Sequence, residues 1–171
     1  MRNIVILALL LFLLIFEAES QTGNAQPGQP VEQSVRIKVD GAKELTILLP
    51  EFKKLPRVTL KVKDHQGAEA EYSGVELREL LTAAGAKLGS ELRGKNLAFY
   101  VVVTARDDYK GVFGIAEVDT GFRDQRIILA DQKNGKALSE DAGPFQVIVE
   151  GDKRHGRFVR QVKEIFVRRV E

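Results

Sequence analysis

Short stretches in which apolar and polar residues alternate run through most of this chain, and they restrict it to a β-rich fold. Alternation with a period of two is the pattern of a strand that buries one face. The stretches with this pattern, or with an apolar run of strand length, are Val35–Val39, Leu45–Leu49, Val58–Val62, Glu69–Tyr72, Leu97–Thr104, Tyr109–Phe113, Ile127–Ala130 and Phe145–Val149. Leu97–Thr104 is almost entirely apolar, which predicts a central strand buried on both faces. Asn134-Gly135 predicts a tight hairpin turn.

One segment has helical spacing instead. Apolar residues recur with a helical period between Val75 and Ala84, with Ser73 in place for an N-cap and Gly85 just past the end. A short helical turn or loop is expected at Pro50–Pro56, and a turn of helix is expected before a last strand. Because strands and helices do not alternate along the chain, the fold class is α+β, a β-rich mixed-sheet domain with one or two helices.

The N-terminus has the three parts of a secretory signal peptide. Arg2 supplies a positive charge, Ile4–Phe16 is continuously apolar, and Ala18 and Ser20 suit a small-residue cleavage site before Gln21. The alternative is an uncleaved membrane anchor, but this apolar run is shorter than the about 20 residues that a spanning helix needs. We therefore expect residues 1–20 to be removed, which leaves a periplasmic or secreted protein without a stable membrane anchor.

Composition narrows the function of the remaining chain. Residues 21–34 are rich in Gln, Gly and Pro and read as a flexible linker, so residues 35–171 form one domain. Loss of one Arg and two Glu with the signal changes the net charge from +2 to +3, which is too small to indicate nucleic acid as a partner. There is no cysteine, and this excludes disulfides, thiolate metal sites and cysteine nucleophiles in the chain.

Several short motifs occur in an order that resembles a known family. They are Tyr72-Ser73-Gly74-Val75-Glu76-Leu77 before Leu80-Leu81, Ala105-Arg106-Asp107-Asp108-Tyr109-Lys110, Leu129-Ala130-Asp131 with Asn134-Gly135-Lys136-Ala137-Leu138, Ala142-Gly143-Pro144-Phe145-Gln146-Val147-Ile148-Val149, and Val162-Lys163-Glu164-Ile165. Together they resemble the molybdopterin-binding domain of the sulfite oxidase family. The resemblance implies a mixed β-rich fold of that type, whose loops in the enzymes enclose a pterin dithiolene with molybdenum.

The chain departs from this family's pattern where the metal chemistry is concerned. In the enzymes a cysteine thiolate ligates the metal, but the corresponding stretch here, Val58–Val62, has no sulfur. Gln146 stands where the family often has Arg, and Asp108 where it often has Gly. The N-terminus also lacks the Arg-Arg pair of the twin-arginine route, by which folded cofactor-containing enzymes are exported. We therefore expect no cofactor, although the resemblance leaves molybdopterin as a possibility, and we expect no redox catalysis.

The densest basic segment is the first candidate ligand-binding site. Lys153, Arg154, His155 and Arg157 follow Gly151-Asp152 in a predicted loop, where their donors could converge on a phosphate, sulfate or carboxylate. The alternative is a solvated basic face, which charge runs usually mark.

The predicted hairpin tip after the central strand is the second candidate. Arg106, Asp107, Tyr109 and Lys110 lie there, and the resemblance places this loop beside the cofactor pocket. The alternative is an ordinary polar turn with an internal Arg–Asp pair.

No residue suggests catalysis or a metal site. His65 and His155 lack metal-ligand spacing, and the chain has no Gly-x-Ser-x-Gly motif. Three functions remain open: an exported domain that binds an anionic or pterin-like molecule without redox turnover, a molybdopterin-dependent oxidoreductase or subunit of one, and a non-catalytic scaffold for a protein partner.

Overall fold

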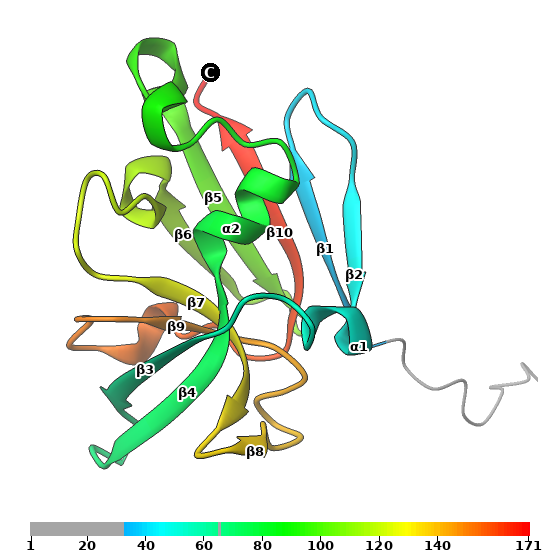
Figure 1. The fold of residues 1–171 in the computed structure, drawn as a ribbon, viewed down its shortest axis with the longest axis vertical. Helices are drawn as coiled ribbons and strands as arrows, with labels where there is room; N and C mark the ends of the chain where they lie inside the picture. Colours follow the sequence, from blue (N-terminus) through cyan, green and yellow to red (C-terminus); the bar gives the residue numbers. More distant parts are fainter. Residues whose placement is uncertain (1–32, 65) are drawn as a thin grey trace, which may run out of the picture. The chain divides into compact units, whose positions relative to one another are not determined.

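A computed structural model describes residues 33–64 and 66–171, which fold into two β-sheets with short helices between them (Figure 1). The strands of the first sheet, in their order across it, are β2 (Leu45–Leu48), β1 (Ser34–Val39), β10 (Val162–Arg169), β5 (Phe99–Ala105) and β6 (Lys110–Gly114). In this sheet β1 and β10 are parallel and the other neighbours are antiparallel. The first and last strands of the described chain, β1 and β10, therefore lie side by side.

The second sheet is built around β7. Its strands are β3 (Val58–Lys63), β4 (Glu69–Glu76), β7 (Ile127–Lys133) and β8 (Lys136–Ala137), with β9 (Gln146–Val149) also paired to β7. All of its pairs are antiparallel. These strands and the mixed first sheet confirm the predicted β-rich α+β class.

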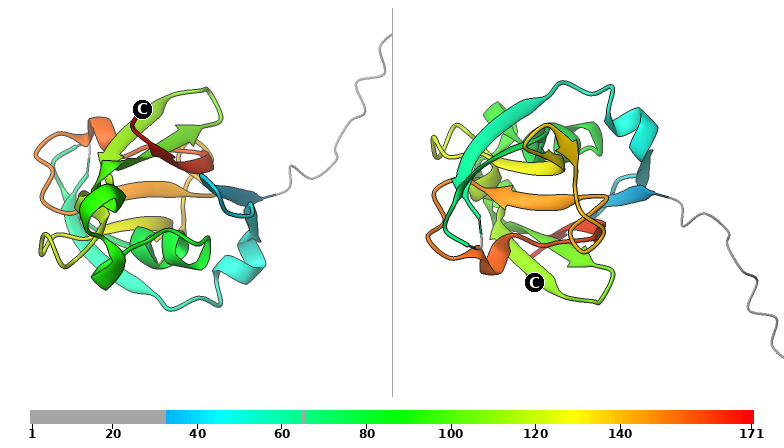
Figure 2. Two further views of the ribbon diagram at one scale, coloured as in Figure 1. Left: turned by 90° about the horizontal axis from the view of Figure 1, so that it is seen from above. Right: turned by 90° about the horizontal axis from the view of Figure 1, so that it is seen from below.

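Two α-helices and four 3-10 helices connect the strands. They are α1 (Leu49–Phe52), α2 (Leu77–Ala83), η1 (Gly89–Glu91), η2 (Gly94–Ala98), η3 (Ile115–Val118) and η4 (His155–Arg157). In Figure 1 α2 lies across one face of the first sheet, and Figure 2 shows the same arrangement from above and below. In the described part of the chain, none of the helices combines the length and hydrophobicity that crossing a bilayer requires.

The core lies between the sheets and is closed by aromatic and branched side chains. Phe52, Phe113 and Phe145 are fully buried, and the rings of Phe52 and Phe145 meet edge to face with centroids 4.9 Å apart. This contact ties α1, beside the first sheet, to the start of β9 in the second. Burial of aromatic surface is the largest contribution that single side chains make to such a core.

Two local predictions were wrong. The helix begins at Leu77 rather than Val75, and Ser73 is not its N-cap, because β4 continues through Glu76 to pair with β7. The central strand β5 begins at Phe99 rather than Leu97. It is not buried on both faces, because Val102 is only partly buried and its cross-strand partner on β6, Val112, is 53% exposed. Val75 and Glu76 have helical spacing in the sequence, but their pairing with β7 keeps them in a strand. The open face beside β5 follows from β6 being the edge strand of the first sheet.

The predicted turns have the geometry that their sequences require. Gly85 follows α2 with φ +95°, the left-handed conformation that suits a residue just past a helix. Asn134 and Gly135 both have positive φ, 50° and 72°, as the two central residues of a type I′ hairpin turn do. This turn joins β7 to β8.

The pairing of β4 with β7 is interrupted by a bulge. Ser73 is opposite Gln132 and Gly74 is opposite Ala130, so Asp131 is the extra residue on β7. A Cβ atom on Gly74 would stand 2.0 Å from the carbonyl oxygen of Leu129, which is backbone and cannot rotate away. The bulge therefore depends on a residue without a side chain.

We expect Gly74→Ala to destabilise the domain by about 3 kcal/mol, because β7 would have to move off β4. The matched control is Gly114→Ala, where φ is −62° and the nearest atom to the new Cβ is a side-chain oxygen of Glu117 at 3.7 Å. Urea unfolding followed by circular dichroism measures both variants. Equal unfolding midpoints for the two would contradict the steric argument.

Candidate functional site

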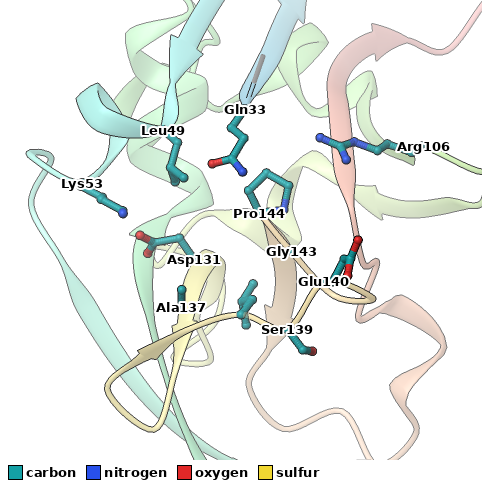
Figure 3. Close-up of a pocket in the computed structure, with 11 residues that line it drawn as sticks. Gln33, Leu49, Lys53, Arg106, Asp131, Ala137, Ser139, Glu140, Gly143 and Pro144 are labelled. Atoms are coloured by element: carbon teal, nitrogen blue, oxygen red, sulfur yellow. The ribbon is translucent and has the colours of Figure 1, made fainter. Parts of the chain in front are cut away.

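A pocket of ≈ 390 Å³ opens where the end of α1, the tip of the β5–β6 hairpin and the loop after β8 meet (Figure 3). Its lining residues are Gln33, Leu49, Lys53, Arg106, Asp131, Ala137, Leu138, Ser139, Glu140, Gly143 and Pro144. The volume lies within the range of small-molecule sites. Cationic, acidic, amide and apolar groups therefore converge here from four separate parts of the chain.

Two exposed cations, Lys53 and Arg106, line this pocket together with the carboxylates of Asp131 and Glu140. Lys53 directly follows α1, where its N–H donates to the carbonyl of Leu49 at 3.1 Å. Arg106 directly follows β5, where its N–H donates to the carbonyl of Gln161 at 3.0 Å. Within residues 33–64 and 66–171, neither side chain has a carboxylate within ion-pair distance. Figure 3 shows them entering the pocket from opposite sides.

Asp131 is a buried carboxylate on the pocket wall. Its side chain is 1% exposed, and Oδ1 forms a short ion pair with Nη2 of Arg57. Arg57 Nε also donates to the hydroxyl of Ser73 at 3.2 Å, across from the bulge. Among the described residues, no hydrogen-bond donor meets Oδ2 of Asp131. Nη1 of Arg57 is likewise buried without a hydrogen-bond partner in the described chain, so the ion pair leaves one polar atom of each side chain unpaired.

A second hollow of ≈ 300 Å³ lies on the other side of the loop that contains Leu138 and Ser139. Its cations are already paired with carboxylates. Lys133 Nζ lies 3.0 Å from Asp64 Oδ2, and Arg160 Nη1 lies 3.2 Å from Asp141 Oδ2. The lining also contains Gln146, at the position where the resembling family often has Arg.

These pairs shift the pKa values of their members. The hydrogen bond with Asp64 raises the pKa of Lys133, and the same contact lowers the pKa of Asp64. A hydrogen bond from Ser139 lowers the pKa of Asp141, with a smaller effect from Arg160. Both cations of the second hollow are therefore engaged by carboxylates of the protein itself.

The structure places the predicted hairpin-tip residues at the end of β5 and the start of β6. The Tyr109 hydroxyl donates to the carbonyl of Gly156 at 2.5 Å, which joins the tip to the basic loop, and the Tyr109 N–H donates to Asp107 Oδ1 at 3.0 Å. Arg106 alone among the four lines the ≈ 390 Å³ pocket. Lys110 is exposed on β6.

The basic loop is held by one of its own arginines. Arg157 donates to both oxygens of Asp152 at 2.8 and 2.9 Å and to Glu117 Oε2 at 2.6 Å, and it lies 4.9 Å from the ring centroid of Phe113. The bond with Asp152 is the largest of the effects that raise its pKa. Its donors are therefore already used within the protein.

The other members of the basic loop do not reach the ≈ 390 Å³ pocket. Lys153 and Arg154 are exposed, and the ring of His155 lies 4.5 Å from that of Phe158. The hairpin tip and the basic loop are thus neighbours, but they do not form one pocket. Their role in ligand binding stays a prediction.

Sequence reasoning missed Lys53 and Asp131. Asp131 lies in one of the motifs that resemble the family, but the motif does not mark it as a pocket residue, and 77 positions along the chain separate it from Lys53. Only the pairing of β4 with β7 and the position of α1 bring them to one pocket.

The polar groups of this pocket suit an anionic organic group and do not suit a metal. The described residues contain no group of three or more His, Asp or Glu side chains placed to hold a metal ion, and the chain has no cysteine. His65, which was considered as a metal ligand together with His155, lies outside the described residues. Lys53, Arg106 and the amide of Gln33 can hold negatively charged oxygen atoms, but none can replace a sulfur ligand.

Comparisons with known proteins agree with the fold. The family described as "Oxidoreductase molybdopterin binding domain" matches residues 25–171. Among solved structures, the sulfane dehydrogenase SoxCD from Paracoccus pantotrophus is similar with a TM-score of 0.61 at 20% identity, over 80% of this chain and 38% of that chain. The chain thus spans well under half of that protein, and the likeness concerns the fold alone. A comparison with curated proteins gives no match.

The ion pairs of Arg157 predict a pH dependence of stability. Burial raises the pKa of Glu117, but the hydrogen bonds from Arg157 and the Gly114 N–H and the nearby arginine charges outweigh it, so this pKa lies below the usual 4.5. A lowered carboxyl pKa stabilises the fold above the unfolded-state value, and this contribution is lost as the pH falls through the folded-state value.

We therefore expect the melting temperature to fall below pH 4.5, and Glu117→Gln to reduce this fall. The effect is below about 1 kcal/mol, since the side chain is 36% exposed and its charge is screened. Differential scanning calorimetry between pH 3 and 7 measures the melting temperature of each variant. Glu69→Gln, on the exposed side of β4, is the control, and an identical pH profile for the two variants would refute the assignment.

Proposed function

Because the chain belongs to the oxidoreductase molybdopterin-binding domain family, we propose that it is a ligand-binding member that holds an anionic small molecule without redox turnover of its own. The observation that carries this proposal is the pair Lys53 and Arg106 in one pocket of ≈ 390 Å³. Two cations without carboxylate partners in the described chain attract a phosphate, sulfate or carboxylate, and an arginine can bind such a group with two parallel hydrogen bonds.

The lack of a protein sulfur ligand supports binding rather than catalysis. Molybdopterin, when bound, supplies its metal with dithiolene sulfur and carries an anionic phosphate. In this chain Lys53 and Arg106 would hold such a phosphate, and no side chain offers the additional thiolate. The family membership favours the second candidate function, a molybdopterin-dependent oxidoreductase or subunit of one, in which non-protein ligands complete the metal site.

We expect Lys53→Ala and Arg106→Ala each to weaken the binding of inorganic pyrophosphate about tenfold, as the loss of one charge-assisted hydrogen bond does. Isothermal titration calorimetry measures the affinities. Lys61→Ala and Arg93→Ala, which remove exposed cations away from the pocket, are the matched controls.

The same titration tests the basic loop as the alternative binding site for the anion. If Lys153→Ala and Arg154→Ala weaken pyrophosphate binding while Lys53→Ala and Arg106→Ala do not, the anion binds at the loop and the pocket assignment is wrong. The two sites can be separated in this way because the loop residues do not line the pocket.

We also propose that the protein is exported, with residues 1–20 as the signal and a linker from Gln21 that is slightly shorter than predicted, because Ser34 already belongs to β1. The positive start and the short apolar run support this. Native mass spectrometry of material from the host's envelope is expected to give a chain that begins at Gln21 and carries no molybdenum. One molybdenum per chain would establish the oxidoreductase instead, and a chain that begins at Met1 would refute cleavage.

A further inference from the structure

A largely apolar groove of ≈ 440 Å³ opens beside β2, the strand at one edge of the first sheet (Figure 1). The groove shares no lining residue with the ≈ 390 Å³ pocket, so what binds to it does not depend on the proposed anion binding. Its apolar lining comes from β2, the segment after α1, and α2, and includes Leu45, Ile47, Leu55, Pro56, Leu80 and Ala83.

This apolar lining is open to solvent. Ile47 and Leu80 are buried, but Leu45 and Leu55 are only partly buried, and Ala83 on α2 is exposed. Contiguous apolar surface of this kind is typical of a place where another chain packs.

The backbone of β2 is free on the side that faces away from β1. The N–H of Leu49 donates to the carbonyl of Gln33 at 2.7 Å, so in this antiparallel pair the backbone groups of Leu45 and Ile47 also face β1. The N–H and C=O of Thr46, which lies between them, point outward. Within residues 33–64 and 66–171, no other element forms a backbone hydrogen bond with Thr46. Such an edge is a template for one more strand.

A strand added at this edge directs side chains into the groove. Side chains alternate between the two faces of a strand, so the residues opposite Leu45 and Ile47 lie on the same face as these two groove-lining side chains. The residue between them is opposite Thr46 and points to the other face of the sheet. The groove therefore suits two apolar side chains that are two positions apart on an extended segment.

The charged part of the lining favours a cationic segment. It consists of the exposed carboxylates of Glu51 and Glu79, and the lining contains no Lys, Arg or His. In the described chain Glu51 forms no ion pair, and Glu79 forms only a long one, 4.0 Å from Arg78 Nη1. Lysine or arginine side chains that flank the two apolar residues complement these charges.

Two occupants from the chain itself fit less well. Residues 21–32 contain no basic residue and no two large apolar residues two positions apart. A second copy paired through the same edge would bring the acidic grooves of both copies side by side, and like charges repel.

We propose that the groove binds an extended segment of a partner protein, which adds to β2 as a strand. The segment pairs with Thr46, places two apolar side chains in the groove and directs basic residues toward Glu51 and Glu79. In this mode of recognition the backbone hydrogen bonds give affinity, and the pockets for alternate side chains give specificity.

The probe is the peptide acetyl-Lys-Thr-Val-Thr-Ile-Thr-Lys-amide, whose Val and Ile enter the groove. Isothermal titration calorimetry on the exported form of the protein compares it with two matched peptides, one with Glu for both Lys and one with Ser for Val and Ile. We expect the charge reversal to weaken binding about fivefold and the loss of apolar side chains to weaken it at least about tenfold. Equal affinities of the three peptides would contradict the assignment.

Hydrogen exchange on the unmodified protein tests strand addition directly. With the lysine peptide at saturation, the Thr46 N–H should exchange at least about tenfold more slowly, because it gains a hydrogen bond. The Thr59 N–H on β3, the edge of the second sheet, is the reference and should not change. It also points outward, since the Asp64 N–H donates to the Ala68 carbonyl at 2.7 Å in the β3–β4 pair. An unchanged Thr46 rate in the complex overturns strand addition.

Variants assign the two contacts. Thr46→Pro removes an N–H that β1 does not use and should weaken the lysine peptide at least about tenfold, whereas Thr59→Pro, the matched control, should not. Glu79→Lys should weaken the lysine peptide and strengthen the glutamate peptide, and Glu69→Lys, at an exposed position of β4, should do neither. Circular dichroism checks that each variant is folded.

The remaining outcomes identify other occupants. A dimer that Thr46→Pro dissociates would make a second copy the occupant. A Thr46 N–H that loses its protection when residues 21–32 are removed would make the chain's own segment the occupant, and either result overturns the proposal. If the lysine peptide does not bind, the groove assignment falls, while the pyrophosphate titration decides the anion pocket separately.

Discussion

The close approach of β7 to β4 at Gly74 is the contact on which the rest of the structure depends. Leu129 lies where a side chain on Gly74 would have to be, so the two backbones meet directly. This approach places Asp131 in a bulge, and the carboxylate then pairs with Arg57 at the start of β3. One missing side chain thus fixes the centre of the second sheet, a buried ion pair and one wall of the pocket.

The pocket is distinguished by two cations that enter it from opposite sides, whereas the cations of the second hollow are paired with carboxylates. Some cations near the hairpin tip and the loops face carboxylates, as Arg157 faces Asp152 and Lys133 faces Asp64. In these pairs the opposite charges largely cancel, so the paired cations attract an anionic ligand only weakly. Lys53 and Arg106 lack such partners in the described chain, so both remain available to an anion that enters the pocket.

The sequence predicts the strands well because each one carries its own pattern. The alternation in Val35–Val39 and the turn at Asn134-Gly135 are local signals, and both have the expected structure. Ser73 was misassigned because an N-cap and a strand residue look alike until the partner strand is known. Lys53 and Asp131 could not be predicted, since their meeting depends on sheet pairing between distant segments.

A scaffold of this family without a cysteine separates ligand recognition from metal ligation. Recognition needs polar atoms at fixed positions, and here Arg57 and the bulge hold Asp131 by backbone and side-chain contacts that involve no metal. Metal ligation needs a soft donor, which the chain does not contain. Because the pocket wall rests on the pairing of the strands alone, its geometry does not depend on a sulfur ligand.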